Sequence, residues 1–426
     1  MNKNNIEVIE ITSVAHGGFC VGRLAGGKVA MVRGALPGER VRVRVTSERS
    51  KVAYAQVVEV LTASPDRVEH IWSEGAAAGL GGVELGHVAY PAQLRWKREV
   101  LAEALRRNGS DALVAEVSRV APDWSVASLG ASPGRSRVSF ALDSAGFPVM
   151  SEAGTHRQHR FSSFPLLVAN LEGLRLFDRK LAFAPGSRVK AVAPSASAPV
   201  FAVGSEVFDA DFVPTTPRVR EVVRVGARVG ARVGARVGAR EHTYRIFASS
   251  FWQTDYRAPA VLVGELLAGV GDISDFEVLE LYSGSGLFSV FLAEAVGAAG
   301  RLTTVEGDAL AVKSAGYNLK HAGFVGVSVE RASVSARFLR GVDFGQRVSR
   351  GSLVVADPPR SGLSRDVAGA ICGLEPDLVA LISCDPVSCA RDLEALRRGG
   401  YRLQSFRVFD LFPYTQHVEV LSVLGR

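Results

Sequence analysis

The stretch Val278-Leu279-Glu280-Leu281-Tyr282-Ser283-Gly284-Ser285-Gly286 decides the fold. It is an apolar strand that runs into a turn with two glycines, and a helical pattern begins at Leu287. Glycine lets the backbone approach a ligand closely, and in a doubly wound sheet this happens at the carboxyl end of a strand. A dinucleotide site would place a third glycine near Ser289, and the loop lacks the lysine that cradles phosphates. The stretch therefore predicts a site for a nucleoside without phosphates.

More apolar strands follow this one, separated by helical stretches. They lie at 277–282, 302–306, 353–357 and 378–384. Such alternation is typical of a parallel sheet with helices on both faces. The stretches 401–413 and 418–424 are two strands with little between them, so they predict an antiparallel pair. The expected fold class is α/β: a doubly wound, mostly parallel sheet closed by a C-terminal antiparallel hairpin.

Two acidic residues follow strands of this sheet. Glu306 ends the strand after the glycine turn, where a carboxylate suits the hydroxyls of a ribose. Asp357 precedes Pro358-Pro359, and two prolines cannot continue a central strand. Both carboxylates are therefore expected at the carboxyl edge of the sheet. Another doubly wound enzyme with a different ligand remains an alternative at this point.

A thiol and a third carboxyl complete the candidate site. Cys384 ends its strand before Asp385-Pro386, and a helix amino terminus lowers the pKa of a thiol, so a reactive thiolate is expected. Glu419 alternates with apolar neighbours, and burial would raise its pKa and suit it to proton transfer. The alternatives are a structural buried cysteine and an exposed strand glutamate.

Residues 1–62 have the pattern of a small β-barrel. Valine and arginine alternate in Arg40-Val41-Arg42-Val43-Arg44-Val45, and Gly17-Gly18, Gly26-Gly27 and Pro37-Gly38 supply turns. A closed, OB-like barrel is the simplest fold for such short strands. Its arginine face could lie against phosphates or could be an ordinary solvated face.

The remaining chain divides into two further units. Residues 63–245 are expected to hold a linking helix at 92–108 and a central, β-rich α+β domain, and residues 246–426 the doubly wound domain. Four tandem Val-Gly-Ala-Arg copies fall in 225–240 and are interpreted as a low-complexity surface insertion.

Composition sets broad limits. Hydrophobic residues make up 47% of the 426 residues, enough for packed cores, and no apolar run reaches the length of a membrane span. The four cysteines do not form a disulfide framework, and the start carries no apolar signal core, so a cytoplasmic protein is expected. The net charge of +7 is compatible with a polyanionic partner but does not establish one. No spacing predicts a metal site.

Several motifs, taken together, resemble those of the RNA 5-methyluridine methyltransferase family. The resemblance covers nearly the whole chain and lies in Asp357-Pro-Pro-Arg360, Ser383-Cys-Asp-Pro386, Phe412-Pro-x-Thr-x-His-Val-Glu419 and Ser250-Phe-Trp-Gln253. The N-terminal barrel resembles a TRAM domain, a small RNA-binding module, including Ala35-Leu-Pro-Gly-Glu39. Gln93-Leu94 and Lys97 match the start of the family's linking helix.

The resemblance implies a class I methyltransferase fold and a set of roles. Cys384 would be the nucleophile and Glu419 the base. The residues implied to bind S-adenosylmethionine are Gln253, Tyr282, Leu287, Glu306 and Asp357.

Two departures from the family pattern matter. Many members bind an iron–sulfur cluster through four cysteines, but the matching positions here are Glu74, Leu80, Val83 and Phe164, so no cluster is expected. A polar or acidic residue that meets adenine is expected near Ala332 or Ser333, and these two residues depart from that pattern.

The sequence therefore predicts a monomeric enzyme that methylates carbon 5 of uridine in tRNA or rRNA through a covalent cysteine adduct. One alternative is a cytosine-C5 methyltransferase, although such enzymes commonly place a cysteine where this chain has Arg360. The other is a catalytically inactive RNA-binding protein, against which the intact Cys384, Glu419 and Asp357 argue.

Overall fold

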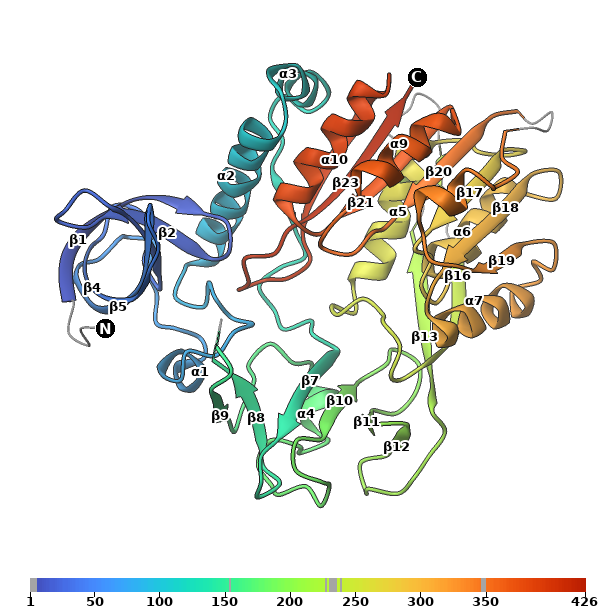
Figure 1. Cartoon of the computed structure of the whole chain (residues 1–426). Coiled ribbons are helices and arrows are strands. Elements are labelled where there is room, and N and C mark those ends of the chain that lie inside the picture. The colour runs from blue at the N-terminus through green and yellow to red at the C-terminus, as the bar shows by residue number, and fades with distance from the viewer. Residues whose placement is uncertain (1–5, 153–154, 227, 230–235, 238–239, 346–349) are drawn as a thin grey trace.

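The computed structural model describes residues 6–152, 155–226, 228–229, 236–237, 240–345 and 350–426. Figure 1 shows a barrel on one side, a small β-rich region below and a large sheet with its helices opposite the barrel. Within the described ranges, no helix is both long and apolar enough to cross a membrane.

The N-terminal barrel is closed, as predicted. Its strands are β1 (Ile6–Ala15), β2 (Phe19–Arg23), β3 (Val29–Arg33), β4 (Arg40–Glu48) and β5 (Val52–Thr62), in the order β1-β2-β3-β5-β4. The alternation in β4 is as expected, because Val41 and Val43 are buried in the barrel core and the alternating arginines at 40, 42 and 44 are exposed.

The linking helix α2 (Tyr90–Asn108) belongs to two cores at once. Trp96 and Val100 are buried against the barrel. Leu101 and Leu105, on another face, are buried in the core of the large sheet. Because each buried side chain of this size contributes about 1.5–3 kcal/mol, the helix fixes the barrel to the large sheet.

The central region is built on a six-stranded antiparallel sheet with the order β12-β11-β10-β7-β8-β9. Its elements are α1 (Ser73–Ala77), β7 (Arg137–Leu142), β8 (Pro148–Ser151), β9 (Gln158–Arg160), α4 (Ala169–Glu172), β10 (Arg188–Val192), β11 (Val200–Val203) and β12 (Glu206–Phe208). Aromatic rings fill much of its core, including Trp72, Phe140 and Phe201.

The Val-Gly-Ala-Arg insertion lies between two long strands. These are β13 (Arg218–Val225) and β16 (Arg240–Phe247), which pair antiparallel along their whole length. Two short pieces of the insertion, β14 (Arg228–Val229) and β15 (Arg236–Val237), also pair antiparallel. Residues 227, 230–235 and 238–239 lie outside the described residues.

The large sheet has eight strands in the order β19-β18-β17-β20-β21-β23-β22-β6. The strands are β6 (Val126–Ser128), β17 (Glu277–Leu281), β18 (Arg301–Glu306), β19 (Ser328–Arg331), β20 (Ser352–Ala356), β21 (Leu378–Ser383), β22 (Arg402–Asp410) and β23 (Glu419–Gly425). The run from β19 to β21 is parallel, and β23 pairs antiparallel with both β21 and β22. This confirms the predicted parallel sheet with its antiparallel hairpin.

In the part of the chain that the structure describes, eight helices accompany this sheet. They are α2, α3 (Asp111–Val120), α5 (Ala258–Val270), α6 (Leu287–Val296), α7 (Ala309–His321), α8 (Ala336–Leu339), α9 (Arg365–Gly373) and α10 (Pro386–Arg398). Figure 1 shows helices on both sides of the strands, as a doubly wound sheet requires.

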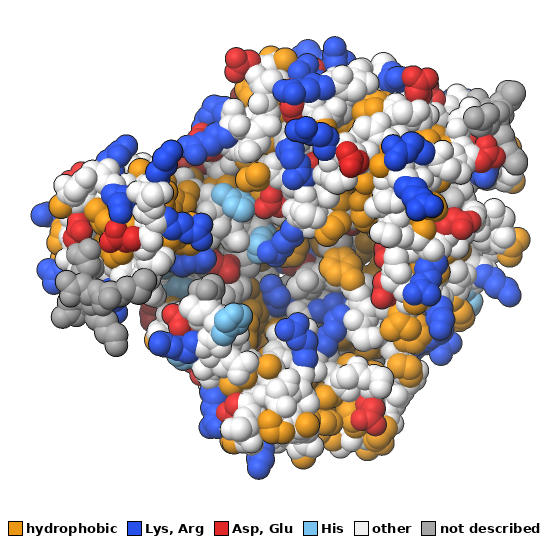
Figure 2. Space-filling model, in the orientation of Figure 1, with side chains coloured by type: hydrophobic (Ala, Val, Ile, Leu, Met, Phe, Trp, Pro, Cys, Tyr) orange, Lys and Arg blue, Asp and Glu red, His pale blue; other side chains and the backbone are white. Residues whose placement is uncertain are grey.

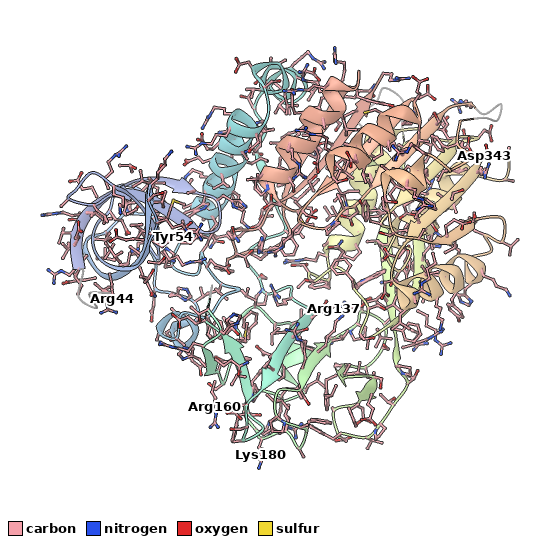
Figure 3. The ribbon with its side chains drawn as sticks, in the orientation of Figure 1. Arg44, Tyr54, Arg137, Arg160, Lys180 and Asp343 are labelled. Atoms are coloured by element: carbon pink, nitrogen blue, oxygen red, sulfur yellow. The ribbon has the colours of Figure 1, made fainter. Side chains whose placement is uncertain are left out.

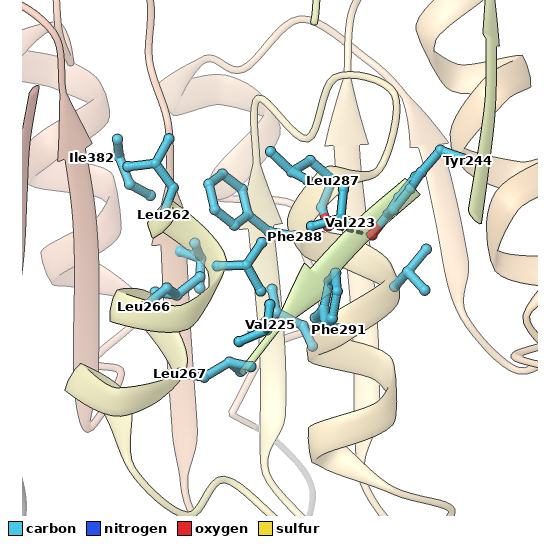
Figure 4. Close-up of a cluster of buried hydrophobic side chains, with 14 of the residues drawn as sticks. Val223, Val225, Tyr244, Leu262, Leu266, Leu267, Leu287, Phe288, Phe291 and Ile382 are labelled. Atoms are coloured by element: carbon cyan, nitrogen blue, oxygen red, sulfur yellow. Dashed lines mark hydrogen bonds between the residues drawn. The ribbon is translucent and has the colours of Figure 1, made fainter. Parts of the chain in front are cut away.

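The expected domain limits at residues 62 and 245 stay a prediction. Hydrophobic cores extend across both positions. Strand β6 pairs parallel with β22 and so belongs to the large sheet. Val223 and Tyr244, from β13 and β16, pack against Leu262 of α5 and Phe291 of α6 (Figure 4). The Tyr244 hydroxyl also donates a hydrogen bond of 2.8 Å to the carbonyl of Leu287.

Candidate active site

The carboxyl ends of β17, β18, β20 and β21 open into a cavity of about 780 Å³. All seven residues singled out from the sequence line it: Gln253, Tyr282, Leu287, Glu306, Asp357, Cys384 and Glu419. A larger hollow of about 1210 Å³ lies at the opposite end of the strands, beside Ser352 and Asp377, and contains none of the seven. The topology thus brings the predicted residues to one place, because parallel strands end at the same edge of a sheet.

The glycine turn after β17 shapes one wall of this cavity. Gly286 has a φ of +87°, and a Cβ there would lie 3.1 Å from the Cα of Ala315, so only glycine lets α6 and α7 approach this closely. The Gly284 amide donates a hydrogen bond of 3.0 Å to one carboxylate oxygen of Glu306, and the Asp308 amide donates one of 2.7 Å to the other. Glu306 is therefore held by backbone groups at the cavity wall.

Three cavity-lining serines have hydroxyls without a hydrogen-bond partner among the described residues. They are Ser250, Ser283 and Ser285, and each hydroxyl is buried. Buried hydroxyls are rarely left unpaired in proteins. This arrangement suits a ligand that carries several polar groups of its own.

Cys384 and Glu419 face the same cavity from adjacent strands. Glu419 is only 4% exposed, at the start of β23, and Cys384 directly follows β21, with which β23 pairs. The pKa of the Cys384 thiol is raised to about 12: burial is the largest cause, the carboxyls of Glu419 and Asp357 act in the same direction, and Arg360 opposes them. The expectation of a thiol with a lowered pKa is therefore wrong for this structure, because burial and acidic neighbours outweigh the helix amino terminus.

Asp357 and Glu419 are two acids that line the same cavity. Burial raises the pKa of Asp357 to about 7, and burial together with Asp357 raises the pKa of Glu419 well above its ordinary value. Burial disfavours the charged form of both carboxyls, and the charge of one disfavours the charge of the other. The pKa of Glu419 is shifted in the direction predicted from the sequence, upward through burial.

Arg360 and His417 line the cavity as well, although the sequence did not single them out as site residues. The Arg360 guanidinium donates a hydrogen bond of 2.9 Å to Nε2 of His417. Burial and Arg360 lower the pKa of His417 to about 4, so the imidazole is neutral and accepts this hydrogen bond. Each of the two residues stands in a motif quoted above, Arg360 in Asp357-Pro-Pro-Arg360 and His417 in Phe412-Pro-x-Thr-x-His-Val-Glu419, and these motifs were the signal for the pair.

The linking helix α2 positions the loop that carries His417 and leads to Glu419. Lys97 and Asp410 form an ion pair of 2.5 Å in which neither side chain is exposed, and Lys97 also donates to the carbonyl of Phe412 at 2.9 Å. The Gln93 side-chain oxygen accepts a hydrogen bond of 2.7 Å from the Tyr414 amide. These contacts fix the loop from a helix more than 300 residues away in the sequence.

The barrel also reaches this edge of the sheet. Nε2 of His16, in the turn between β1 and β2, lies 2.8 Å from Oδ2 of Asp385. The other Asp385 oxygen accepts hydrogen bonds from the Val387 and Ser388 amides, so Asp385 caps α10 immediately after Cys384.

The four positions compared above with cluster-binding cysteines lie in the central region. Leu80, Val83 and Phe164 are buried in its apolar core. Glu74 accepts hydrogen bonds from the backbone and hydroxyl of Ser162. Apolar packing therefore occupies three of these four positions.

The sheet, its glycine turn and the N-terminal barrel define a methyltransferase of the S-adenosylmethionine-dependent class joined to a TRAM domain. A model of the tRNA (uracil-5-)-methyltransferase family matches residues 232–426, and a TRAM domain model matches residues 5–58.

Full-length relatives agree with these models. An uncharacterised RNA methyltransferase of Streptomyces coelicolor is 33% identical over 98% of this chain and 92% of its own, and one of Bifidobacterium longum is 31% identical over 98% and 96%. The chain therefore belongs to the tRNA (uracil-5-)-methyltransferase family of RNA methyltransferases. The crystal structure of Pyrococcus abyssi tRNA (uracil-54, C5)-methyltransferase with S-adenosyl-L-homocysteine has a TM-score of 0.65 at 19% identity, covers 98% of this chain and 99% of its own, and so has the same fold.

Proposed function

We propose that this RNA methyltransferase transfers a methyl group to carbon 5 of a uridine in tRNA or rRNA, with Cys384 as nucleophile and Glu419 as base. The observation that carries the proposal is the shared cavity, in which a thiol and a carboxyl lie beside Asp357. A nucleophile at C6 and a base at C5 are the two groups that substitution at C5 of a uracil requires.

The cavity suits S-adenosylmethionine. Glu306, fixed by two backbone amides, would meet the ribose hydroxyls, and Gln253, Tyr282, Leu287 and Asp357 would hold the rest. The unpaired serine hydroxyls of this wall would find partners on such a ligand. Ala332 offers the adenine no polar side chain. When bound, the cofactor supplies an electrophilic methyl group and a positive charge.

The side chains of this chain account for the rest of the chemistry. Cys384 first loses its proton to solvent. Its Sγ then adds to C6 of the ring, and the C5=C6 electron pair moves towards O4 and makes C5 nucleophilic. After C5 has gained the methyl group, ionised Glu419 removes the C5 proton. The electrons of that C–H bond re-form C5=C6, and Cys384 leaves as a thiolate. Arg360, the cation that lowers the thiol pKa, favours both the attacking and the leaving thiolate.

The target uridine must leave its base stack to enter this cavity, at a cost of a few kcal/mol. Contacts between RNA and the rest of the enzyme would offset that cost, and such contacts predict an affinity that falls steeply with added salt. We further propose that the enzyme acts as a monomer in the cytoplasm.

The test uses Glu419→Gln. This variant should add Cys384 to the ring and transfer the methyl group, but it should fail to eliminate the C5 proton. A slowly migrating protein–RNA band should therefore appear on a denaturing gel when cofactor is present, and it should be absent from the Glu419→Gln, Cys384→Ala double variant. A band of equal strength in the double variant would refute the nucleophile assignment. Nucleoside digestion of RNA treated with wild-type enzyme should give 5-methyluridine, and 5-methylcytidine instead would refute the uridine assignment.

A further inference from the structure

The central region supports one wall of the active-site cavity. Residues 249–254, which we call the cofactor loop, lie between β16 and α5, and all six line the cavity. Figure 2 shows a hollow in the middle of this face of the molecule, with Lys and Arg side chains around it. The contacts that hold the cofactor loop therefore bear on how the cavity receives its ligand.

Lys190 of β10 reaches the cofactor loop from the central sheet. Its neighbours Val189 and Ala191 are buried in the apolar core of the central region, so Lys190 lies on the other face of the strand. Its Nζ donates a hydrogen bond of 2.8 Å to the carbonyl of Ser249 and one of 2.5 Å to the carbonyl of Ser250. One side chain thus holds two successive peptide groups of the loop.

The two carbonyls compensate the charge of Lys190. The pKa of Lys190 is lowered to about 8: burial is the largest cause, and the Arg137 guanidinium acts in the same direction. Arg137, at the end of β7 that faces the middle of the molecule (Figure 3), occupies Glu221 through a hydrogen bond of 2.6 Å, and the Ser195 hydroxyl donates to the other Glu221 oxygen at 2.8 Å. A half-buried ammonium that has lost part of its hydration needs such acceptors, and the cofactor loop supplies them.

The second half of the cofactor loop has supports of its own on both sides of Gln253. Trp252 is buried, and its ring lies 5.1 Å from that of Tyr244, centre to centre. The Ser136 amide and hydroxyl donate hydrogen bonds of 2.8 and 3.1 Å to the carbonyl of Thr254. These contacts leave the first half of the loop to other supports.

The first half of the loop packs little against the protein. Phe251 is 68% exposed, although a phenylalanine ring is usually buried. The Ser250 hydroxyl is buried at the cavity and has no hydrogen-bond partner among the described residues. Because this half has so little packing, the two hydrogen bonds from Lys190 are the contacts expected to fix it.

We propose that Lys190 is a positioning residue of the cofactor site, through which the central region holds the cofactor loop so that Ser250 and Gln253 meet S-adenosylmethionine. The inference rests on the proposed function, because that function places Gln253 against the cofactor. A loop that is already held in its binding geometry loses less conformational freedom when the ligand binds, so the affinity is higher. Lys190 would therefore act on cofactor affinity and not on the groups that react with the uracil.

The first test compares two matched substitutions in the full-length chain, with titration calorimetry of S-adenosyl-L-homocysteine as the measurement. Lys190→Met keeps the apolar stem and removes the donor, and Lys180→Met makes the same change on an exposed lysine at the outer end of the central region (Figure 3). Lys190→Met should weaken binding about tenfold and Lys180→Met less than about twofold. Unchanged affinity in Lys190→Met, or equal losses in the two variants, would overturn the proposal.

A second test asks whether Lys190 acts through the loop. In a background of Ser250→Ala with Gln253→Ala, the contacts that the loop offers the ligand are already removed. Lys190→Met should then weaken the binding of S-adenosyl-L-homocysteine by less than about threefold, because residues that act as one unit are not additive. A full tenfold loss in this background as well would mean that Lys190 affects the cavity by another route, and the proposal would fail.

Hydrogen exchange of the cofactor-free enzyme separates local positioning from general loosening. The Ser250 amide donates a hydrogen bond of 3.0 Å to the Phe247 carbonyl, so its exchange reports on the loop. Lys190→Met should speed exchange about tenfold in the peptide that spans residues 248–256 and leave peptides from β7 and β11 unchanged. Faster exchange throughout the central sheet would show that Lys190 merely stabilises that sheet, and would refute a positioning role.

These outcomes are separable from those of the proposed function. Calorimetry and hydrogen exchange need neither RNA nor methyl transfer, so failure to form 5-methyluridine would refute the reaction and leave the role of Lys190 standing. In steady-state methylation, Lys190→Met should raise the KM for S-adenosylmethionine about tenfold and change kcat by less than about twofold. A fall in kcat with an unchanged KM would refute this inference and leave the reaction standing.

Discussion

The ionisation of Cys384 gives the most direct test of the site as described. With a pKa of about 12, about one thiol in ten thousand is ionised at pH 8, which is about a thousandfold fewer than for a cysteine with the ordinary pKa of 9.0. A thiolate with a higher pKa is also more nucleophilic: with a Brønsted coefficient of about 0.4–0.5, the rate constant of each thiolate is about 20-fold higher, which offsets part of this loss. Cys384 in the cofactor-free enzyme should therefore be alkylated about 50-fold more slowly than a free cysteine at pH 8.

The assay is the rate of iodoacetamide labelling of the Cys384 peptide, measured by mass spectrometry from about pH 7 to about pH 10. The rate should rise about tenfold per pH unit over the whole range, whereas an ordinary thiol levels off above its pKa. Arg360→Gln should slow labelling and Glu419→Gln should speed it, each by up to about tenfold, because these groups shift the thiol pKa in opposite directions. A plateau below pH 9, or equal effects of the two substitutions, would refute the reasoning.

Three further predictions concern contacts outside the reacting groups. Lys97→Met leaves the buried Asp410 carboxylate without its ion-pair partner and should lower the free energy of unfolding in urea by about 3–5 kcal/mol. Adding Asp410→Leu should recover most of this loss; no recovery would mean that the unpaired buried charge is not the cause. His16→Ala removes a largely exposed hydrogen bond to Asp385, so the free energy of unfolding should change by less than about 1 kcal/mol. The single-turnover methylation rate should nevertheless fall about threefold or more, and an unchanged rate would show that His16 does not help to position Cys384 through Asp385. Glu280 has a pKa of about 8 in the folded chain, against an ordinary value of 4.5, so the folded chain binds this proton more tightly and the resulting stabilisation is lost as pH rises from about 4.5 to about 8. Glu280→Gln should therefore flatten that part of the curve of unfolding free energy against pH, and an unchanged slope would contradict the burial of a protonated carboxyl.

Much of the fold could be predicted because its signals are local. An apolar run that ends in glycines or prolines marks the end of a buried strand wherever it occurs, and β17, β20 and β21 all begin and end within a residue or two of the predicted limits. Strand β6 could not be predicted in this way, because its three residues carry almost no pattern and only their pairing with β22 makes them a strand.

The candidate site likewise has features that the sequence could predict and features that only the structure shows. Asp357 and Cys384 follow strands that are recognisable in the sequence, so their place at the sheet edge could be deduced. The direction of the Cys384 pKa shift could not, since it depends on burial and on Glu419, a residue from another strand. Arg360 and His417 each stand in a recognised motif, but they are 57 residues apart, so the hydrogen bond between them becomes apparent only in the structure.

The sequence by itself determined the succession of strands and helices along the chain, the edge at which the chemistry-bearing residues end and the family to which the chain is similar, because each of these depends on neighbours along the chain. Only the tertiary structure decided the ionisation of the thiol, the double packing of α2 and the side of the barrel that adjoins the cavity. Lys97 and Asp410, or His16 and Asp385, meet across more than 300 residues, and no local pattern encodes a contact between side chains so far apart.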